Sequence, residues 1–85
     1  MIVRLLYFVG VRDALGLSSE LVDLPPCVTT LASLRDHLAA RGEPWSALGA
    51  DRRLRFAINN AMEGRADAPV SDGDEVAIFP PVTGG

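Results

Sequence analysis

The stretch Ile2-Val3-Arg4-Leu5-Leu6-Tyr7-Phe8-Val9 follows the first methionine and is apolar or aromatic at every position except the arginine. A run of this composition that ends at a glycine predicts a buried strand in the centre of a sheet. Glu75-Val76-Ala77-Ile78-Phe79 predicts another strand, which leads directly into Pro80. If these first and last strands are adjacent and parallel, the connection between them must contain a helix.

The main helix is predicted between Thr30 and Gly42. Thr30 has the hydroxyl expected of an N-cap, and Gly42 fits the position just beyond the helix end. Four apolar residues recur at helical spacing and form one stripe: Leu31, Leu34, Leu38 and Ala39. One face of this helix is therefore expected to pack on the sheet.

Shorter elements complete the pattern. Val11 to Gly16 predicts one helical turn, and Ser19 to Leu24 predicts a strand with Leu21 directed inward. Arg53 to Asn59 predicts a strand whose inward residues are Leu54, Phe56 and Ile58. Residues 61–70 are predicted as a loop with room for one short strand, and residues 71–74 as a tight turn.

The order strand, strand, helix, strand, strand places the chain in the α+β class. With the first and last strands paired at the centre, the arrangement is the ubiquitin-like β-grasp: a mixed sheet with one main helix packed on it. We therefore expect a globular β-grasp domain over residues 1–79, followed by an extended C-terminal tail over residues 80–85.

The amino-acid composition excludes several classes of function. The chain has 85 residues, enough for one small domain, and a net charge of −3, which argues against nucleic-acid binding. All eight basic residues are arginines, so Schiff-base chemistry on a lysine is excluded. Cys27 is the only cysteine, which fits a reducing compartment. The apolar opening run is too short for a membrane helix and lacks a cleavage site, so we expect a cytoplasmic protein without membrane contact.

No catalytic constellation is evident. Phosphate-loop and metal-ligand spacings are absent, so no metal or bound cofactor is expected. His37 is interpreted as a solvated helix residue and Cys27 as a small buried hydrophobe. Three acidic residues are interpreted as a charged turn rather than a cation site: Asp72, Asp74 and Glu75.

Some arginines leave two interpretations open. Arg12, beside Asp13, is either a surface ion pair or a partner contact. Three neighbours form a basic cluster that is either a solvated strand entry or a docking patch for an acidic partner: Arg52, Arg53 and Arg55.

The chain ends with Pro80-Pro81-Val82-Thr83-Gly84-Gly85. The prolines hold the backbone extended, and the glycines can enter a channel too narrow for a residue with a Cβ. Gly85 offers a terminal carboxylate on a thin arm. Because chemistry is lacking elsewhere, these features predict a carrier on which other enzymes act.

The segment from Asp72 to Gly85 resembles the C-terminal signature of the MoaD family, the ubiquitin-like sulfur carriers related to ThiS. The likeness extends over nearly the whole chain, with Val11-Arg12 after the first strand and Ala57-Ile58-Asn59 at a strand end. Asn60 departs from the family, whose members often carry glutamine there.

The resemblance implies a small subunit of molybdopterin synthase that is not itself catalytic. Gly85 would be converted to a glycyl adenylate by an E1-like adenylating enzyme, MoeB, which uses ATP. A sulfurtransferase would supply the sulfur of the resulting thiocarboxylate (1-thioglycine). The tail would then enter the large subunit, MoaE, which holds the catalytic residues, and deliver sulfur to cyclic pyranopterin monophosphate.

The resemblance also implies an assembly of two small and two large subunits. The partner channel would receive the residues before Gly85: Pro80, Pro81, Val82, Thr83 and Gly84. Phe79 and Arg12 are predicted at the partner interface. Alternation places Phe79 opposite Val76 and Ile78, so it is either a partner anchor or a core residue.

Two other functions remain open at this point. One is a related sulfur carrier for thiamine, cysteine or tRNA thiolation, with the same chemistry at Gly85 and a different acceptor. The other is a ubiquitin-like interaction module whose tail is inert.

Overall fold

The structure is a computed structural model that describes residues 1–50 and 53–80. Its helices and strands follow in this order: β1 (Ile2–Tyr7), α1 (Val9–Leu15), β2 (Ser19–Asp23), α2 (Leu31–Ala39), α3 (Ser46–Ala50), β3 (Arg55–Ile58), β4 (Ala61–Glu63) and β5 (Glu75–Phe79). No helix in the described part of the chain has the length and apolar character needed to cross a membrane.

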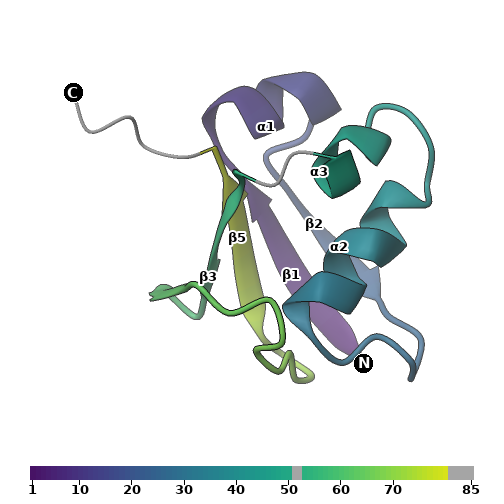
Figure 1. Cartoon of the computed structure of the whole chain (residues 1–85), viewed down its shortest axis with the longest axis vertical. Helices are drawn as coiled ribbons and strands as arrows, with labels where there is room; N and C mark the ends of the chain where they lie inside the picture. Colours follow the sequence, from purple (N-terminus) through teal and green to yellow (C-terminus); the bar gives the residue numbers. More distant parts are fainter. Residues whose placement is uncertain (51–52, 81–85) are drawn as a thin grey trace.

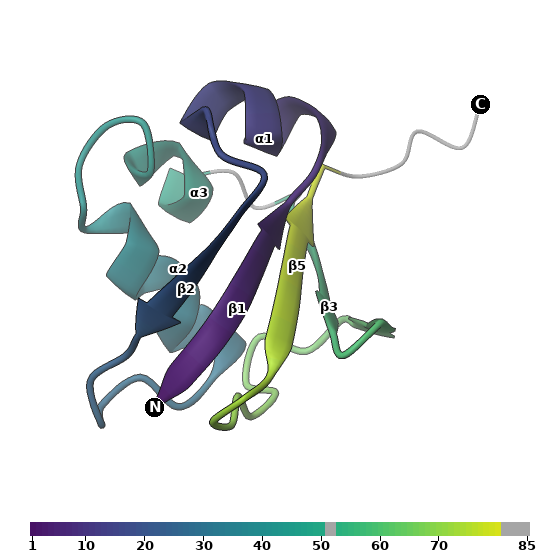
Figure 2. The ribbon, with the colours of Figure 1, turned by 180° about the vertical axis from the view of Figure 1, so that it is seen from behind.

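The strands form one mixed sheet in the order β2-β1-β5-β3-β4. β1 and β5 are parallel at its centre, with Leu5 opposite Val76, and the other pairs are antiparallel. α2 and α3 cover one face, α1 lies at one end, and the other face carries no helix (Figures 1 and 2). This α+β arrangement is the predicted ubiquitin-like β-grasp.

The core lies between the sheet and α2. Val3, Leu5 and Tyr7 alternate with more exposed residues along β1 and are almost completely buried. From α2, Leu34 and Leu38 close the core at 0 % exposure. Burying a side chain of this size contributes about 1.5–3 kcal/mol, so the predicted helical stripe is the main attachment of α2 to the sheet.

The ends of the helices follow local chemistry. The Thr30 hydroxyl accepts a hydrogen bond from the Ser33 amide at 3.2 Å, and the Ser33 hydroxyl accepts one from the Thr30 amide at 2.9 Å. This reciprocal capping box confirms the predicted start of α2. At the end of α1, Gly16 adopts φ 73°, a left-handed conformation that glycine adopts without strain.

The orientation predicted for Leu21 is wrong. Its side chain is 67 % exposed, whereas Val22 and Leu24 are buried. β2 pairs with β1 so that Leu21 lies opposite Arg4 on the helix-free face. Because side chains alternate along a strand, this register turns Val22 to the core.

The bounds of β1, α1 and β3 also differ from the prediction, and β3 is confined to Arg55–Ile58. β1 ends at Tyr7 because Phe8 is the N-cap of α1, which is longer than the single turn expected. The loop predicted for residues 61–70 does hold one short strand, as the prediction allowed: β4, which pairs with β3. Between β3 and β4, Asn59 and Asn60 have φ of 51° and 70°, the positive values that a two-residue type I′ hairpin turn requires.

Candidate functional site

β5 carries the chain to the root of the C-terminal tail. It lies between β1 and β3 and ends at the same end of the sheet as β1, where α1 begins (Figure 1). The Phe8 amide donates to the Ile78 carbonyl at 3.2 Å, which extends the β1–β5 pairing beyond Tyr7. Pro80 follows directly and is half-buried. Pro80 therefore follows directly on a strand that is paired on both sides.

The residues predicted to carry sulfur and enter a partner channel lie outside the described residues, so their roles stay predictions: Pro81, Val82, Thr83, Gly84 and Gly85.

Phe79 lies on the helix-free face. Val76 and Ile78 are 0 % and 1 % exposed and face the core, so alternation turns Phe79 away from α2. It pairs in register with Arg55 on β3 and is half-buried. Phe79 is thus outside the main core, and its role as an anchor for a partner stays a prediction.

Apolar side chains gather around Phe79 on this face. Register places Leu6 of β1 beside Ala77 of β5, and Met62 of β4 lies two strands from Ala77 in the same row. Phe8 continues β1 toward Phe79 and is 43 % exposed, and Met62 is 66 % exposed. We call this set the tail-root face: Leu6, Phe8, Met62, Ala77 and Phe79. Exposed apolar patches of this kind mark interaction surfaces.

Of the tail-root face, the sequence interpretation identified only Phe79 and missed Leu6, Phe8, Met62 and Ala77. For Phe8 a signal existed, since the period of two that buries Val3, Leu5 and Tyr7 turns Phe8 outward. For Met62 no local signal existed, because its strand is only three residues long and is defined by pairing with β3.

An apolar groove of about 230 Å³ opens beside the root of the tail. Its walls include Val11 and Leu15 from α1, Leu48 from α3, and Pro80. The groove has room for an apolar side chain of a protein that approaches this end of the sheet.

Arg12 lies on α1 and is exposed. Its Nε is 3.8 Å from Asp13 Oδ1, and both side chains are more than half exposed. A solvated pair of this kind contributes at most about 1 kcal/mol, so little holds the guanidinium in place. Both interpretations of Arg12 are compatible with this geometry.

The predicted arginine cluster is only partly described, since Arg52 lies outside the described residues. The Arg55 Nη1 donates to the Arg53 carbonyl at 3.3 Å, and both residues are exposed. Arg55 neighbours Phe79 in register and also lines a pocket between β3 and α2.

The acidic turn before β5 is held by its own hydrogen bonds. Asp72 Oδ1 accepts from the Ile2 amide at 2.7 Å, and Asp74 Oδ1 accepts from Asn59 Nδ2 at 3.0 Å. The Asn59 Oδ1 in turn accepts from the Glu75 amide at 3.0 Å. These contacts support the interpretation of a structural turn. Among the described residues, no cluster of His, Cys, Asp and Glu is arranged to hold a metal ion.

Neither of the other two candidate reactive side chains lies at the tail root. Cys27 is exposed, in the loop before α2, so the prediction that it is buried is wrong. His37 is half-buried in the last turn of α2, so it is less solvated than predicted.

Comparison with known proteins identifies the family. The sequence pattern of the ThiS family matches residues 5–85. The chain belongs to the ThiS family. A curated relative, the molybdopterin synthase sulfur carrier subunit of Escherichia coli strain K12, is 40 % identical over 83 residues, which span 98 % of this chain and 99 % of the relative.

Two solved structures share the fold of this chain. A candidate molybdopterin converting factor, subunit 1, from Pyrococcus furiosus superposes with a TM-score of 0.77 at 26 % identity, covering 96 % of this chain and 99 % of that one. The complex of subunits 1 and 2 of the molybdopterin-converting factor from Helicobacter pylori 26695 contains a chain with the same fold, at 22 % identity, a TM-score of 0.68 and full coverage of both chains.

Proposed function

We propose that this chain is the sulfur carrier subunit of a molybdopterin synthase and that Gly85 carries the sulfur. The observation that supports this most directly is the end-to-end match, at 40 % identity, to a molybdopterin synthase sulfur carrier subunit. The family match runs through Gly85, so it includes the glycines on which the chemistry depends.

The chemistry begins with a poor electrophile. A carboxylate resists substitution because its leaving group would be oxide. An E1-like adenylating enzyme of the MoeB type joins Gly85 to AMP and releases pyrophosphate from ATP, so ATP is used by the partner. A persulfide from a sulfurtransferase displaces AMP, and a second thiol then cleaves the S–S bond to release the thiocarboxylate. The sulfur of Gly85 is now nucleophilic and is transferred to cyclic pyranopterin monophosphate.

The carrier docks on a large subunit of the MoaE type, which supplies the catalytic residues. The tail-root face surrounds the strand that leads into the tail, so a partner covering this face would receive the tail at the same time. Its exposed aromatic and apolar residues are the kind that anchor interfaces. We place Arg12 at the rim of this contact, and we expect an assembly of two small and two large subunits in the cytoplasm.

Intact-protein mass spectrometry tests the carrier chemistry. The full chain, incubated with the adenylating enzyme, a sulfurtransferase and ATP, should gain the mass difference between sulfur and oxygen at its C-terminus. A variant that lacks Gly84 and Gly85 should remain unchanged. Adenylation of the truncated variant would overturn the proposal.

The pathway is tested separately. Carrier loaded with sulfur should convert cyclic pyranopterin monophosphate to molybdopterin when the large subunit is added. Loading without this conversion would assign the chain to another sulfur-transfer pathway, and the molybdopterin function would be wrong.

The docking surface is tested by Phe79→Ala. Loss of a central aromatic anchor should weaken binding to the large subunit by about 2 kcal/mol or more. The matched control is Leu21→Ala, which removes another apolar side chain from the same sheet face, 67 % exposed and outside the tail-root face. If both variants bound the large subunit equally well in a calorimetric titration, Phe79 would not be an anchor of the interface.

A further inference from the structure

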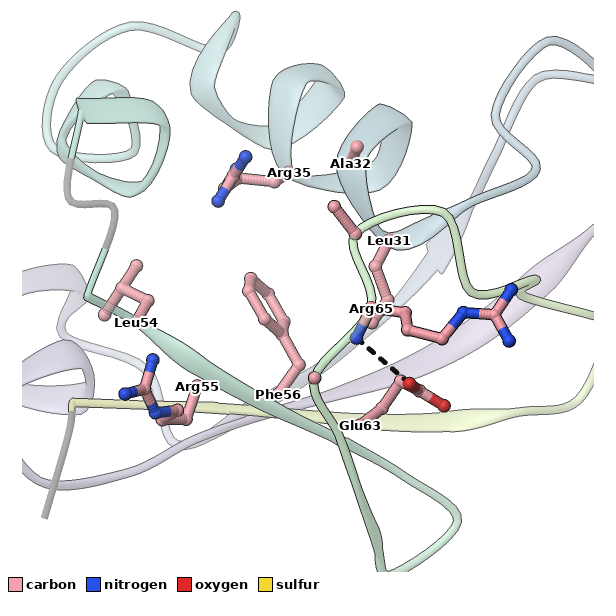
Figure 3. Close-up of a pocket in the computed structure, with 10 residues that line it drawn as sticks. Leu31, Ala32, Arg35, Leu54, Arg55, Phe56, Glu63 and Arg65 are labelled. Carbon is pink, nitrogen blue, oxygen red and sulfur yellow. Dashed lines mark hydrogen bonds between the residues drawn. The ribbon is translucent and has the colours of Figure 1, made fainter.

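A pocket of about 180 Å³ lies between α2, β3 and the segment after β4 (Figure 3). Its walls do not include any residue of the tail-root face. A cavity of ~150 Å³ is large enough to bind benzene, so this pocket has room for a ring-sized group.

The pocket exists because β4 is shorter than the strand it accompanies. β4 ends at Glu63, opposite Phe56, and the chain then turns away at Gly64. Leu54 and Arg55, which precede Phe56 in the chain, therefore have no β4 residue opposite them. The departing segment is held to the start of α2, because the Ala32 amide donates to the Ala66 carbonyl at 2.8 Å. The walls are thus fixed at both ends by backbone hydrogen bonds.

The inner surface of the pocket is apolar. Leu31, Leu54 and Phe56 line it, and each is nearly buried in the rest of the protein. The Phe56 ring lies between the α2 wall and the β3 wall (Figure 3). An aromatic ring of a ligand could pack against it in the offset or edge-to-face arrangements that aromatic pairs prefer.

The charges around this apolar surface are unbalanced. Three arginines and one carboxylate line the pocket, although the whole chain has a net charge of −3. Arg65 is already engaged, with its Nε 3.2 Å from Asp67 Oδ1, and Glu63 Oε1 accepts from the Arg65 amide at 3.0 Å. Arg35 and Arg55 approach from opposite walls beside Leu54 and Phe56, whereas the Arg65 side chain extends away from them (Figure 3).

Arg35 is one of two residues in the described part of the chain with a buried, unpaired donor, and the other, Trp45, does not line the pocket. The Arg35 Nε is buried and has no hydrogen-bond partner among the described residues. Buried donors are nearly always paired, because an unpaired one loses its hydrogen bonds to water without replacement. A guanidinium presents a rigid fork that matches a carboxylate with two parallel hydrogen bonds.

From the pocket's size, its aromatic wall and the unpaired Arg35 Nε, we propose that this pocket binds a small aromatic carboxylate. The ring packs against Phe56 and Leu54, and the carboxylate accepts from Arg35, with Arg55 adding positive charge. This site is independent of the sulfur chemistry proposed for Gly85.

The proposal is tested by nuclear magnetic resonance titration of the ¹⁵N-labelled full chain with benzoate, benzamide and acetate. Benzoate should shift the amide signals of Gly64 and Ala66 and the Arg35 Nε–H signal in a saturable way. Benzamide has the ring without the charge and acetate the charge without the ring, so each should bind at least about tenfold more weakly. Equal affinity for benzoate and benzamide, or no saturation with benzoate, would overturn the proposal.

Two variants locate the contact. Arg35→Gln should weaken benzoate binding about tenfold while the remaining amide signals stay in place. Arg4→Gln removes an exposed arginine from the opposite sheet face and should leave the affinity unchanged. Unchanged binding by Arg35→Gln, or equal losses in both variants, would mean that Arg35 does not hold the carboxylate.

Discussion

Because Tyr7 and Glu20 share a hydrogen bond, the losses of unfolding free energy caused by substituting each residue should not be additive. Tyr7 is 1 % exposed, and its hydroxyl donates to Glu20 Oε1 at 2.7 Å. The same oxygen accepts from Arg41 Nη1 at 2.7 Å, and the Arg41 guanidinium lies 5.2 Å from the centre of the Trp45 ring. One carboxylate thus connects the central strand to the end of α2.

Glu20→Ala leaves the Tyr7 hydroxyl buried without this acceptor. The cost of such a group is about 1–3 kcal/mol, and loss of the partly exposed pair with Arg41 adds at most about 1 kcal/mol. Tyr7→Phe removes the donor while Glu20 keeps Arg41, so it should cost about 1 kcal/mol. In the double variant no hydroxyl is left unpaired. Its cost should therefore be about 1–2 kcal/mol less than the sum of the single costs.

Urea unfolding at neutral pH measures all four free energies of the cycle. In thermal unfolding, each 1 kcal/mol lost from the free energy of unfolding should lower the midpoint temperature by roughly 4–8 °C for a domain of this size. Independent substitutions add within about 0.3–0.5 kcal/mol. Additivity within that margin would show that the hydrogen bond contributes no coupling energy, and the reasoning would be refuted.

Three further predictions follow from the fold. Burial, and then the hydrogen bond to Glu20, raises the pKa of Tyr7, so its contribution to stability is fully present below the unfolded pKa of about 10 and is lost progressively as the pH rises from there toward the raised pKa of the folded state. Since the chain has one tyrosine and no lysine, the unfolding free energy should fall above pH ~10 by up to about 1.4 kcal/mol per pH unit, and Tyr7→Phe should abolish this fall. Leu34→Ala, at a fully buried position, should cost about 2–5 kcal/mol in urea unfolding, whereas Leu21→Ala should stay within about 0.5 kcal/mol. Gly49→Ala places a Cβ 2.9 Å from the Ala39 Cβ and should cost about 1–3 kcal/mol, and adding Ala39→Gly should restore part of the loss; equal stability of the two Gly49→Ala proteins would contradict this close contact.

The residues of the candidate site differ in whether the sequence alone can identify them. The terminal glycines and the prolines before them are a contiguous motif, so their proposed role needs no knowledge of the fold. Phe79 follows from alternation along a single strand. Met62 does not, because it joins the tail-root face only through pairing of β4 with β3.

The amino-acid sequence by itself determined the elements with strong local signals. A nearly continuous apolar run marked β1, alternation marked Val76 and Ile78 as the buried residues of β5, and the Thr30 cap with its leucine stripe marked α2. These signals depend on neighbours within a few positions, so they are present before the chain folds.

Only the tertiary structure decided what depends on pairing between distant segments. The register of β2 against β1 turned Leu21 outward, since a shift of one residue exchanges the two faces of a strand. The early end of β4 left the pocket in which Arg35 and Phe56 meet, although they lie far apart along the chain. Local residue patterns do not specify such contacts, because they form only when the sheet and α2 close on one another.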